Sequence, residues 1–355
     1  MNLPHLRTAV CLLGLAAASA CGSKTDLAID PPDAAPPPAE DAGMDAAVTL
    51  DSGFDAGVDA APVCVPGIVA LDPSTVEVVF VVDRSGSMLA AFDGRPPVGG
   101  ERSRWEILES AMGNALSVFD DRIGVGAKFF PSQSIRAEEG PCDVFSGLDV
   151  EIGPGRAPGV ISQFSRWNPN GGTPVAVATR QALDALLARA DDNNAQFIVV
   201  ATDGAPTCGE SPRADALEVI REAHEEHGVD VYVVGIASTD PEVELLDVMA
   251  VTGGRPRPDS EPRRFYDASD PGLLESLLSE ITRDLVQCVF AVPIPPDEDD
   301  VVEVLVSGDS IPRDPTREDG WDWTNERRAQ LSLFGEACER AIASGGAVRA
   351  NITCN

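Results

Sequence analysis

The chain is poor in positive charge. Its 355 residues include 26 lysines and arginines against 58 aspartates and glutamates, which gives a formal net charge of -32. A nucleic-acid partner needs a basic surface facing its phosphates, so this balance argues against one. The simplest reading of the charge is solubility in an extracellular setting, and it also favours cations at any site lined by carboxylates.

Several motifs of enzymes and zinc sites are also missing. The sequence has no Gly-x-Ser-x-Gly elbow and no Gly-Lys-Ser/Thr loop, so a serine hydrolase and a P-loop nucleotide site lack support. No cysteines have Cys-x-x-Cys spacing, which leaves a zinc site without its usual pattern. His224 and His227 lie three residues apart on a predicted helix and could pair on zinc, but a solvated polar face is the simpler interpretation.

The first 20 residues predict a signal peptide. A short, weakly basic start precedes an apolar stretch, residues 8–20, that is too short for a stable membrane anchor. The run Ala18-Ser19-Ala20-Cys21 resembles the lipobox of bacterial lipoproteins, whose cysteine receives a diacylglycerol. We therefore expect cleavage after residue 20 and lipidation of Cys21, with a plain secretory signal as the alternative. Gly22 then favours the outer membrane or cell surface over the inner membrane.

Composition divides the rest of the chain into three parts. Residues 21–63 are rich in Asp, Ala, Pro and Gly and predict an extended, disordered acidic linker, because they can bury too little apolar surface to fold. Residues 64–288 predict one larger domain. Residues 289–355 predict a small α+β appendage that Cys338 and Cys354 would staple.

Strands and helices alternate between residues 75 and 287. Residues 76–82 form an apolar run, interrupted by Glu77 alone, that is typical of a strand buried on both faces. Further strands are predicted at 122–130, 195–202, 229–237 and 265–267, with helices at 104–119, 174–189, 213–227, 241–251 and 270–287. This alternation is typical of an α/β fold with a parallel sheet and helices on both faces.

Polar side chains follow the ends of two predicted strands. Asp83 begins Asp-Arg-Ser-Gly-Ser, with Ser85 and Ser87 at the next alternate positions, and Asp203 lies in Thr-Asp-Gly. Thr173 lies between them in Gly-Gly-Thr-Pro, at the start of a helix. Ligands of open parallel sheets bind beyond the carboxyl ends of the strands, where these residues would meet. Their hydroxyls and carboxylates are the hard oxygen donors that suit Mg2+, with at least one coordination position left for water or an acidic group.

These three segments closely resemble the metal-ion-dependent adhesion site of von Willebrand factor type A domains. The resemblance covers residues 75–287 and implies a Rossmann-like sheet with bound Mg2+, Mn2+ or Ca2+. It implies that Ser85, Ser87 and Thr173 bind the metal through hydroxyls, and that Asp83 and Asp203 bind it directly or through water. It further implies a protein or peptide partner whose Asp or Glu completes the coordination shell.

The function that we expect is metal-dependent adhesion by a surface-anchored lipoprotein, without enzymatic activity. One alternative is a structural or assembly module in which the metal stabilises loops. A third reading is a phosphotransferase with an Asp at a strand end. Such enzymes usually carry a second Asp two residues later as acid or base, and Ser85 makes a poor substitute.

Six cysteines remain once Cys11 and Cys21 are set aside, and an even set in an exported protein predicts disulfides. Cys208 follows the Asp203 loop and Cys142 lies in a loop-rich stretch, which suggests a bridge at the rim of the site. In type A domains both termini usually emerge opposite the metal. The resemblance therefore implies a Cys64–Cys288 bridge that would hinder movement of the last helix.

Overall fold

The fold is that of a computed structural model, which describes residues 64–119, 121–133, 140–189, 194–238, 242–258, 261–324 and 327–355. The predicted signal peptide, the lipidation site Cys21 and the linker lie outside these residues and stay predictions. No helix in the described ranges is both long and apolar enough to cross a membrane.

Six strands of the described residues form a mixed, mostly parallel sheet with the order β4-β3-β2-β5-β6-β7. Only β4, at one edge, runs antiparallel to its neighbour. The fold class predicted from the sequence is confirmed for this part of the chain. The strands are β2 (Thr75–Asp83), β3 (Ile123–Phe130), β4 (Val150–Gly153), β5 (Asn194–Thr202), β6 (Asp230–Ile236) and β7 (Tyr266–Ala268).

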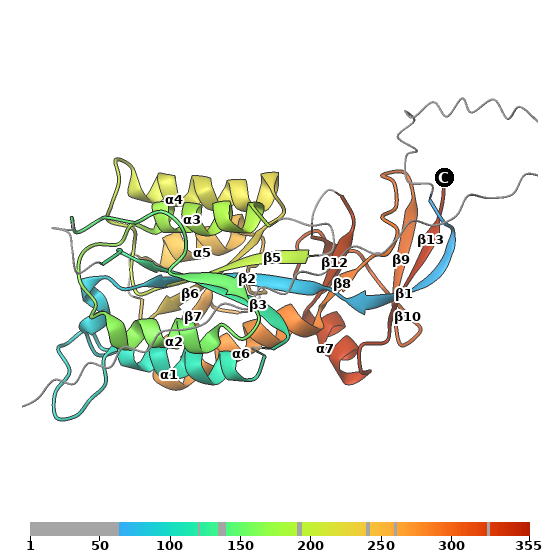
Figure 1. The fold of residues 1–355 in the computed structure, drawn as a ribbon. Helices are drawn as coiled ribbons and strands as arrows, with labels where there is room; N and C mark the ends of the chain where they lie inside the picture. The colour runs from blue at the N-terminus through green and yellow to red at the C-terminus, as the bar shows by residue number, and fades with distance from the viewer. Residues whose placement is uncertain are drawn as a thin grey trace, which may run out of the picture. The chain divides into compact units, whose positions relative to one another are not determined.

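Helices cover both faces of this sheet, three on each (Figure 1). One face packs against α1 (Arg104–Ser117), α2 (Ala157–Arg166) and α6 (Pro271–Gln287). The other packs against α3 (Val175–Leu187), α4 (Pro212–Arg221) and α5 (Glu242–Thr252). A single 3-10 turn, η1 (Gly86–Leu89), follows β2, and a π turn, η2 (Glu222–Glu226), extends α4.

The central strand β2 is apolar on both faces over most of its length. Val78 and Phe80 point into the core beside α1 and α6, whereas Val79 and Val81 point into the core beside α3. Successive side chains of a strand alternate between faces, so both faces must be apolar when both are covered. Asp83 lies at the carboxyl end of this strand, where its buried carboxylate meets the loops beyond the sheet.

A second sheet is the main departure from the sequence prediction. Seven strands in the described part of the chain pair antiparallel in the order β10-β9-β13-β1-β8-β12-β11. The small appendage predicted for residues 289–355 was therefore wrong in size, because β1, from before the first sheet, is a member of this one. The elements are β1 (Gly67–Pro73), β8 (Val289–Ala291), β9 (Val301–Val306), β10 (Asp309–Ile311), β11 (Gly320–Trp323), β12 (Gln330–Phe334), α7 (Gly335–Ala343) and β13 (Val348–Thr353).

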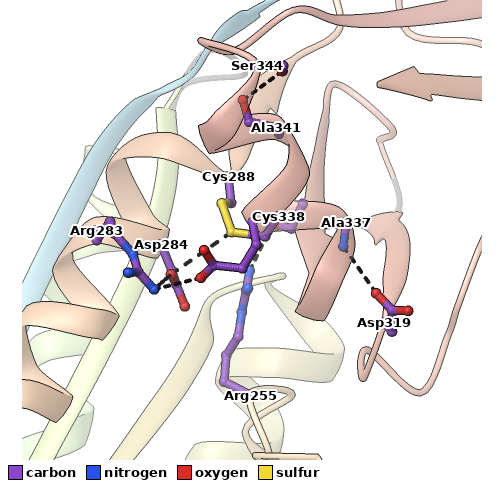
Figure 2. Close-up of a disulfide and its surroundings, with 11 residues drawn as sticks. Arg255, Arg283, Asp284, Cys288, Asp319, Ala337, Cys338, Ala341 and Ser344 are labelled. Atoms are coloured by element: carbon purple, nitrogen blue, oxygen red, sulfur yellow. Dashed lines mark hydrogen bonds and ion pairs between the residues drawn. A yellow bond between two sulfur atoms is a disulfide. The ribbon is translucent and has the colours of Figure 1, made fainter. Parts of the chain in front are cut away.

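The disulfides follow from this pairing. Because β1 runs antiparallel to β13, the start of one strand meets the end of the other, and Cys64 bonds to Cys354. Cys288 at the end of α6 bonds instead to Cys338 of α7, which packs beside it (Figure 2). The predicted Cys64–Cys288 bridge and the Cys338–Cys354 staple were therefore both wrong, and the expected hindrance of the last helix by Cys64 falls with them.

Candidate metal centre

Asp83 ends β2 with its side chain fully buried. One carboxylate oxygen accepts a hydrogen bond from the backbone N–H of Ser85 at 2.8 Å, and the other accepts one from the Thr202 hydroxyl at 2.5 Å. Burial and, second, the nearby carboxylate of Asp203 raise the pKa of Asp83 to about 7. The two carboxylates are thus close enough to repel each other in a dry environment.

Two serine hydroxyls connect the loops of these carboxylates. The Ser85 and Ser87 hydroxyl oxygens lie 2.9 Å apart, and the Ser87 hydroxyl donates to Asp203 Oδ1 at 2.8 Å. Ser85 is buried whereas Ser87 is exposed, so the chain of hydroxyls leads from the interior to the surface. The alternate spacing of Asp83, Ser85 and Ser87 therefore does present their oxygens along one side of a turn.

Thr173 lies on a third loop that is bonded to the other two. Gly171 accepts a hydrogen bond from the Gly86 N–H at 3.1 Å, which connects this loop to the one after β2. The Thr173 N–H donates to the Thr207 hydroxyl at 2.9 Å, and the Thr207 N–H donates back to the Thr173 carbonyl at 3.1 Å. Thr173 is buried at this junction, although no hydrogen bond of its hydroxyl to the serines or carboxylates is among those described.

The Cys142–Cys208 bridge lies against the same loop, where the sequence suggested it. A Cβ added to Gly172 would come within 2.8 Å of the Cys208 sulfur, so the loop packs directly on the disulfide. Gly171 is equally constrained: its φ is +85°, and a Cβ there would lie 2.6 Å from the Pro141 carbonyl oxygen. The two glycines allow this close approach, and the bridge restrains the loop that carries Thr173.

The donor set fits a hard divalent cation. It offers two carboxylates and three hydroxyls from three loops at the carboxyl ends of parallel strands, without a nitrogen or sulfur donor among the five predicted residues. Mg2+ and Mn2+ favour such oxygen donors, and the two neighbouring carboxylates provide negative charge in a buried place. Metal binding itself stays a prediction.

Comparison with known proteins bears on the fold around this site. The family described as "von Willebrand factor type A domain" matches residues 160–280. The chain contains a von Willebrand factor type A domain. The matched part includes the loops of Thr173 and Asp203, and the Asp83 loop precedes it. No curated protein sequence matches the chain.

Solved structures match the chain at low sequence identity and with TM-scores below 0.5. The PilB minor pilin of Streptococcus sanguinis is 18% identical with a TM-score of 0.45, over 60% of this chain and 61% of the pilin. The pilus adhesin SpaC of Lactobacillus rhamnosus GG is 15% identical with a TM-score of 0.45, over 79% of this chain and 38% of the adhesin. A von Willebrand factor type A protein of Catenulispora acidiphila is 13% identical with a TM-score of 0.43, over 82% of this chain and 66% of that protein. The chain therefore spans less than two thirds of the pilin and of SpaC.

The structure adds two residues to the site of the type A domain that sequence reasoning missed. The Thr202 hydroxyl orients Asp83, and the Arg104 guanidinium donates to Asp203 Oδ2 at 2.7 Å. Thr202 belongs to the Thr-Asp-Gly segment, so the sequence could have indicated that it lies at the site. Arg104 had no such signal, because 99 residues separate it from Asp203.

The two histidines have separate partners. His224 Nδ1 lies 2.7 Å from Asp230 Oδ1, and His227 Nε2 lies 3.8 Å from Glu222 Oε1. In the described ranges, the clusters of three or more acidic, His or Cys side chains that could meet at an ion all contain a disulfide-bonded pair of cysteines. The histidine pair therefore gains no support as a zinc site.

Proposed function

We propose that the type A domain binds a divalent cation, Mg2+ or else Mn2+ or Ca2+, through Asp83, Ser85, Ser87, Thr173 and Asp203. Through that cation it binds an exposed Asp or Glu of a protein or peptide partner. The observation that carries the proposal is a set of hydrogen bonds that joins two loops 116 residues apart around oxygen donors. The Ser85 backbone N–H donates to Asp83, and the Ser85 hydroxyl meets the Ser87 hydroxyl, which donates to Asp203.

The residues around the donors prepare them for this task. Thr202 and the Ser85 N–H hold both oxygens of Asp83, so its carboxylate keeps one orientation. Serine and threonine hydroxyls are neutral ligands, and a cation bound with few direct carboxylates keeps enough positive charge to attract a further carboxylate. The bound cation would supply that charge, while the loops determine where it is presented.

The chain is proposed to act outside the cytoplasm. Three disulfides join its described cysteines, and disulfides persist in oxidising compartments. We further propose that Cys21 carries the lipid anchor and that residues 21–63 separate the domain from the membrane, at the outer membrane or cell surface.

Isothermal titration of the chain with Mg2+ tests the metal site. We expect binding by the wild type and none by Asp83→Ala, with Asp93→Ala, an exposed residue outside the site, as the control. Circular dichroism would verify that Asp83→Ala is folded. Equal Mg2+ binding by Asp83→Ala and wild type would reject the site.

The partner is tested by capture from surface extract of the source organism, with Mg2+ and with chelator in parallel. Retention of a protein only with Mg2+, and not by Asp83→Ala, supports adhesion. If Mg2+ raises the melting temperature but no metal-dependent partner is retained, the alternative of a structural or assembly module is favoured. Phosphatase activity that Asp83→Ala abolishes would favour the phosphotransferase reading.

A further inference from the structure

We infer that Arg104 is a positioning residue of the metal centre, which orients Asp203 and sets the net charge of the site. This inference rests on the proposed function, and it assigns a role to a residue outside the five predicted ligands. It concerns how strongly the site holds a cation and how strongly the loaded site attracts an anion.

Arg104 is held firmly at the start of α1. The preceding Ser103 forms a capping box with Glu106, in which each side chain accepts a hydrogen bond from the other residue's backbone N–H. The Arg104 N–H donates to the Ala90 carbonyl at 2.8 Å, so the backbone is also bonded to the loop after η1. The side chain therefore extends from a fixed point.

The guanidinium is buried against one ligand. The Arg104 side chain is 8% exposed, the Asp203 side chain is 1% exposed, and Nη1 lies 2.7 Å from Oδ2. Arg104 Nε is also buried and has no hydrogen-bond partner in the part of the chain that the structure describes. Burial of a guanidinium that has one carboxylate contact and one unpaired N–H donor costs free energy, unless the site gains from its positive charge.

With this contact, the two carboxylate oxygens of Asp203 have different partners. Oδ2 accepts from Arg104, and Oδ1 accepts from the Ser87 hydroxyl, which in turn lies 2.9 Å from the Ser85 hydroxyl. A carboxylate bonded at both oxygens cannot rotate freely. Arg104 therefore fixes Oδ1 toward the proposed cation position.

The charge of Arg104 changes the balance of the whole centre. With both carboxylates ionised, Asp83 and Asp203 contribute -2 and Arg104 contributes +1, which gives -1 without a cation and +1 with a divalent cation. Without Arg104 the loaded centre would be neutral. Arginine stays protonated at any ordinary pH, so this contribution is permanent. Arg104 thus weakens cation binding and strengthens the attraction of the loaded site for a carboxylate.

Mn2+ titration followed by electron paramagnetic resonance tests the inference on the full chain. The variants are Arg104→Gln, which keeps a hydrogen-bond donor without the charge, and Arg104→Lys, which keeps the charge without the planar guanidinium group. Arg102→Gln is the matched control, because Arg102 is exposed two residues earlier and contacts only Ser110 among the hydrogen bonds described.

Arg104→Gln should bind Mn2+ on the order of tenfold more tightly than wild type, because a nearby positive charge is gone. Arg104→Lys should stay within about threefold of wild type and Arg102→Gln should be unchanged, since an exposed charge is screened. In chelator, Arg104→Gln should melt at a lower temperature than wild type, and Mn2+ should raise its melting temperature more than that of wild type.

Three results would overturn the inference. Folded Arg104→Gln that binds Mn2+ as wild type does, or more weakly, would show that Arg104 does not oppose the cation while leaving the metal site intact. An equal effect of Arg102→Gln would show that general surface charge is responsible. If neither wild type nor Arg104→Gln binds Mn2+, the proposed metal site itself fails and this role of Arg104 fails with it.

Discussion

Replacement of Asp230 by Asn should weaken the connection between the two sheets. Asp230 begins β6, and its side chain is 1% exposed. Its carboxylate accepts from Arg255 Nε at 2.7 Å and from Arg317 Nη1 at 2.8 Å, and it contacts His224 Nδ1 at 2.7 Å. Arg317 belongs to the second-sheet region, between β10 and β11. One buried carboxylate therefore balances cations from both parts of the structure.

Arg255 extends the same connection. Its Nη2 donates to the Ser332 hydroxyl of β12 at 2.9 Å, and its guanidinium lies 4.9 Å from the ring centre of Phe334. The Arg255 side chain is 7% exposed, so its charge has little access to water. Loss of the Asp230 charge would leave Arg255 buried without its counterion, and Arg317 would keep only the more distant carboxylate of Asp322, at 3.4 Å.

The expected loss is about 3–5 kcal/mol of unfolding free energy at pH 7, the cost of breaking a buried ion pair by removing one partner. Burial alone would raise the pKa of Asp230, but Arg317 and Arg255 outweigh it and hold that pKa well below its usual value. A lowered pKa contributes stability above the unfolded pKa of about 4, and this contribution is lost as the pH falls. The difference between wild type and Asp230→Asn should therefore shrink from pH 7 to pH 3.

Urea unfolding at both pH values measures this difference. Asp93→Asn is the control, because Asp93 pairs with Arg95 at the surface, where ion pairs contribute little to stability. A loss below about 1 kcal/mol for Asp230→Asn at pH 7, or a difference that grows toward pH 3, would refute the reasoning.

Two further substitutions test the packing of other regions. Burial raises the pKa of Asp284, beside the Cys288–Cys338 bridge (Figure 2), to about 7. Because the pKa of this acid is higher in the folded than in the unfolded protein, the protein loses stability as the pH rises from about 4 to about 7. Asp284→Asn should therefore be more stable than wild type at pH 8, by at most about 4 kcal/mol. Urea unfolding at pH 5 and pH 8 checks this, and equal stabilities at pH 8 would contradict it. Gly235→Ala should lose about 1–3 kcal/mol in thermal or urea unfolding, because its Cβ would lie 2.4 Å from Phe265 Cε2 in the core; an unchanged value would disprove that crowding.

The first sheet could be predicted from the sequence because its strands are covered on both sides. The run predicted at 76–82 became β2, and the helices predicted at 104–119 and 270–287 became α1 and α6 with small shifts at their ends. These segments carry the long apolar or helical patterns that a two-sided core requires.

Elements with weaker patterns were missed for identifiable reasons. The helix α2 begins Ala157-Pro158-Gly159, and Pro with Gly is more typical of a turn. The strand β4 has four residues, one of them exposed Glu151. The strand β1 has a single buried residue, Leu71, and its apolar run covers only residues 68–71, so it shows no alternation and only a short apolar run.

The candidate site was also only partly predictable from the sequence. The sequence by itself was enough to predict five oxygen donors and their loops, because a turn spaces Asp83, Ser85 and Ser87 locally and a strand end positions Asp203. Only the tertiary structure decided that Arg104 would pair with Asp203, and that β1 would join β13 and place Cys64 beside Cys354. These contacts join residues 99 and 290 positions apart. Their formation depends on how helices and strands pack after the chain has folded back on itself, which local spacing does not encode.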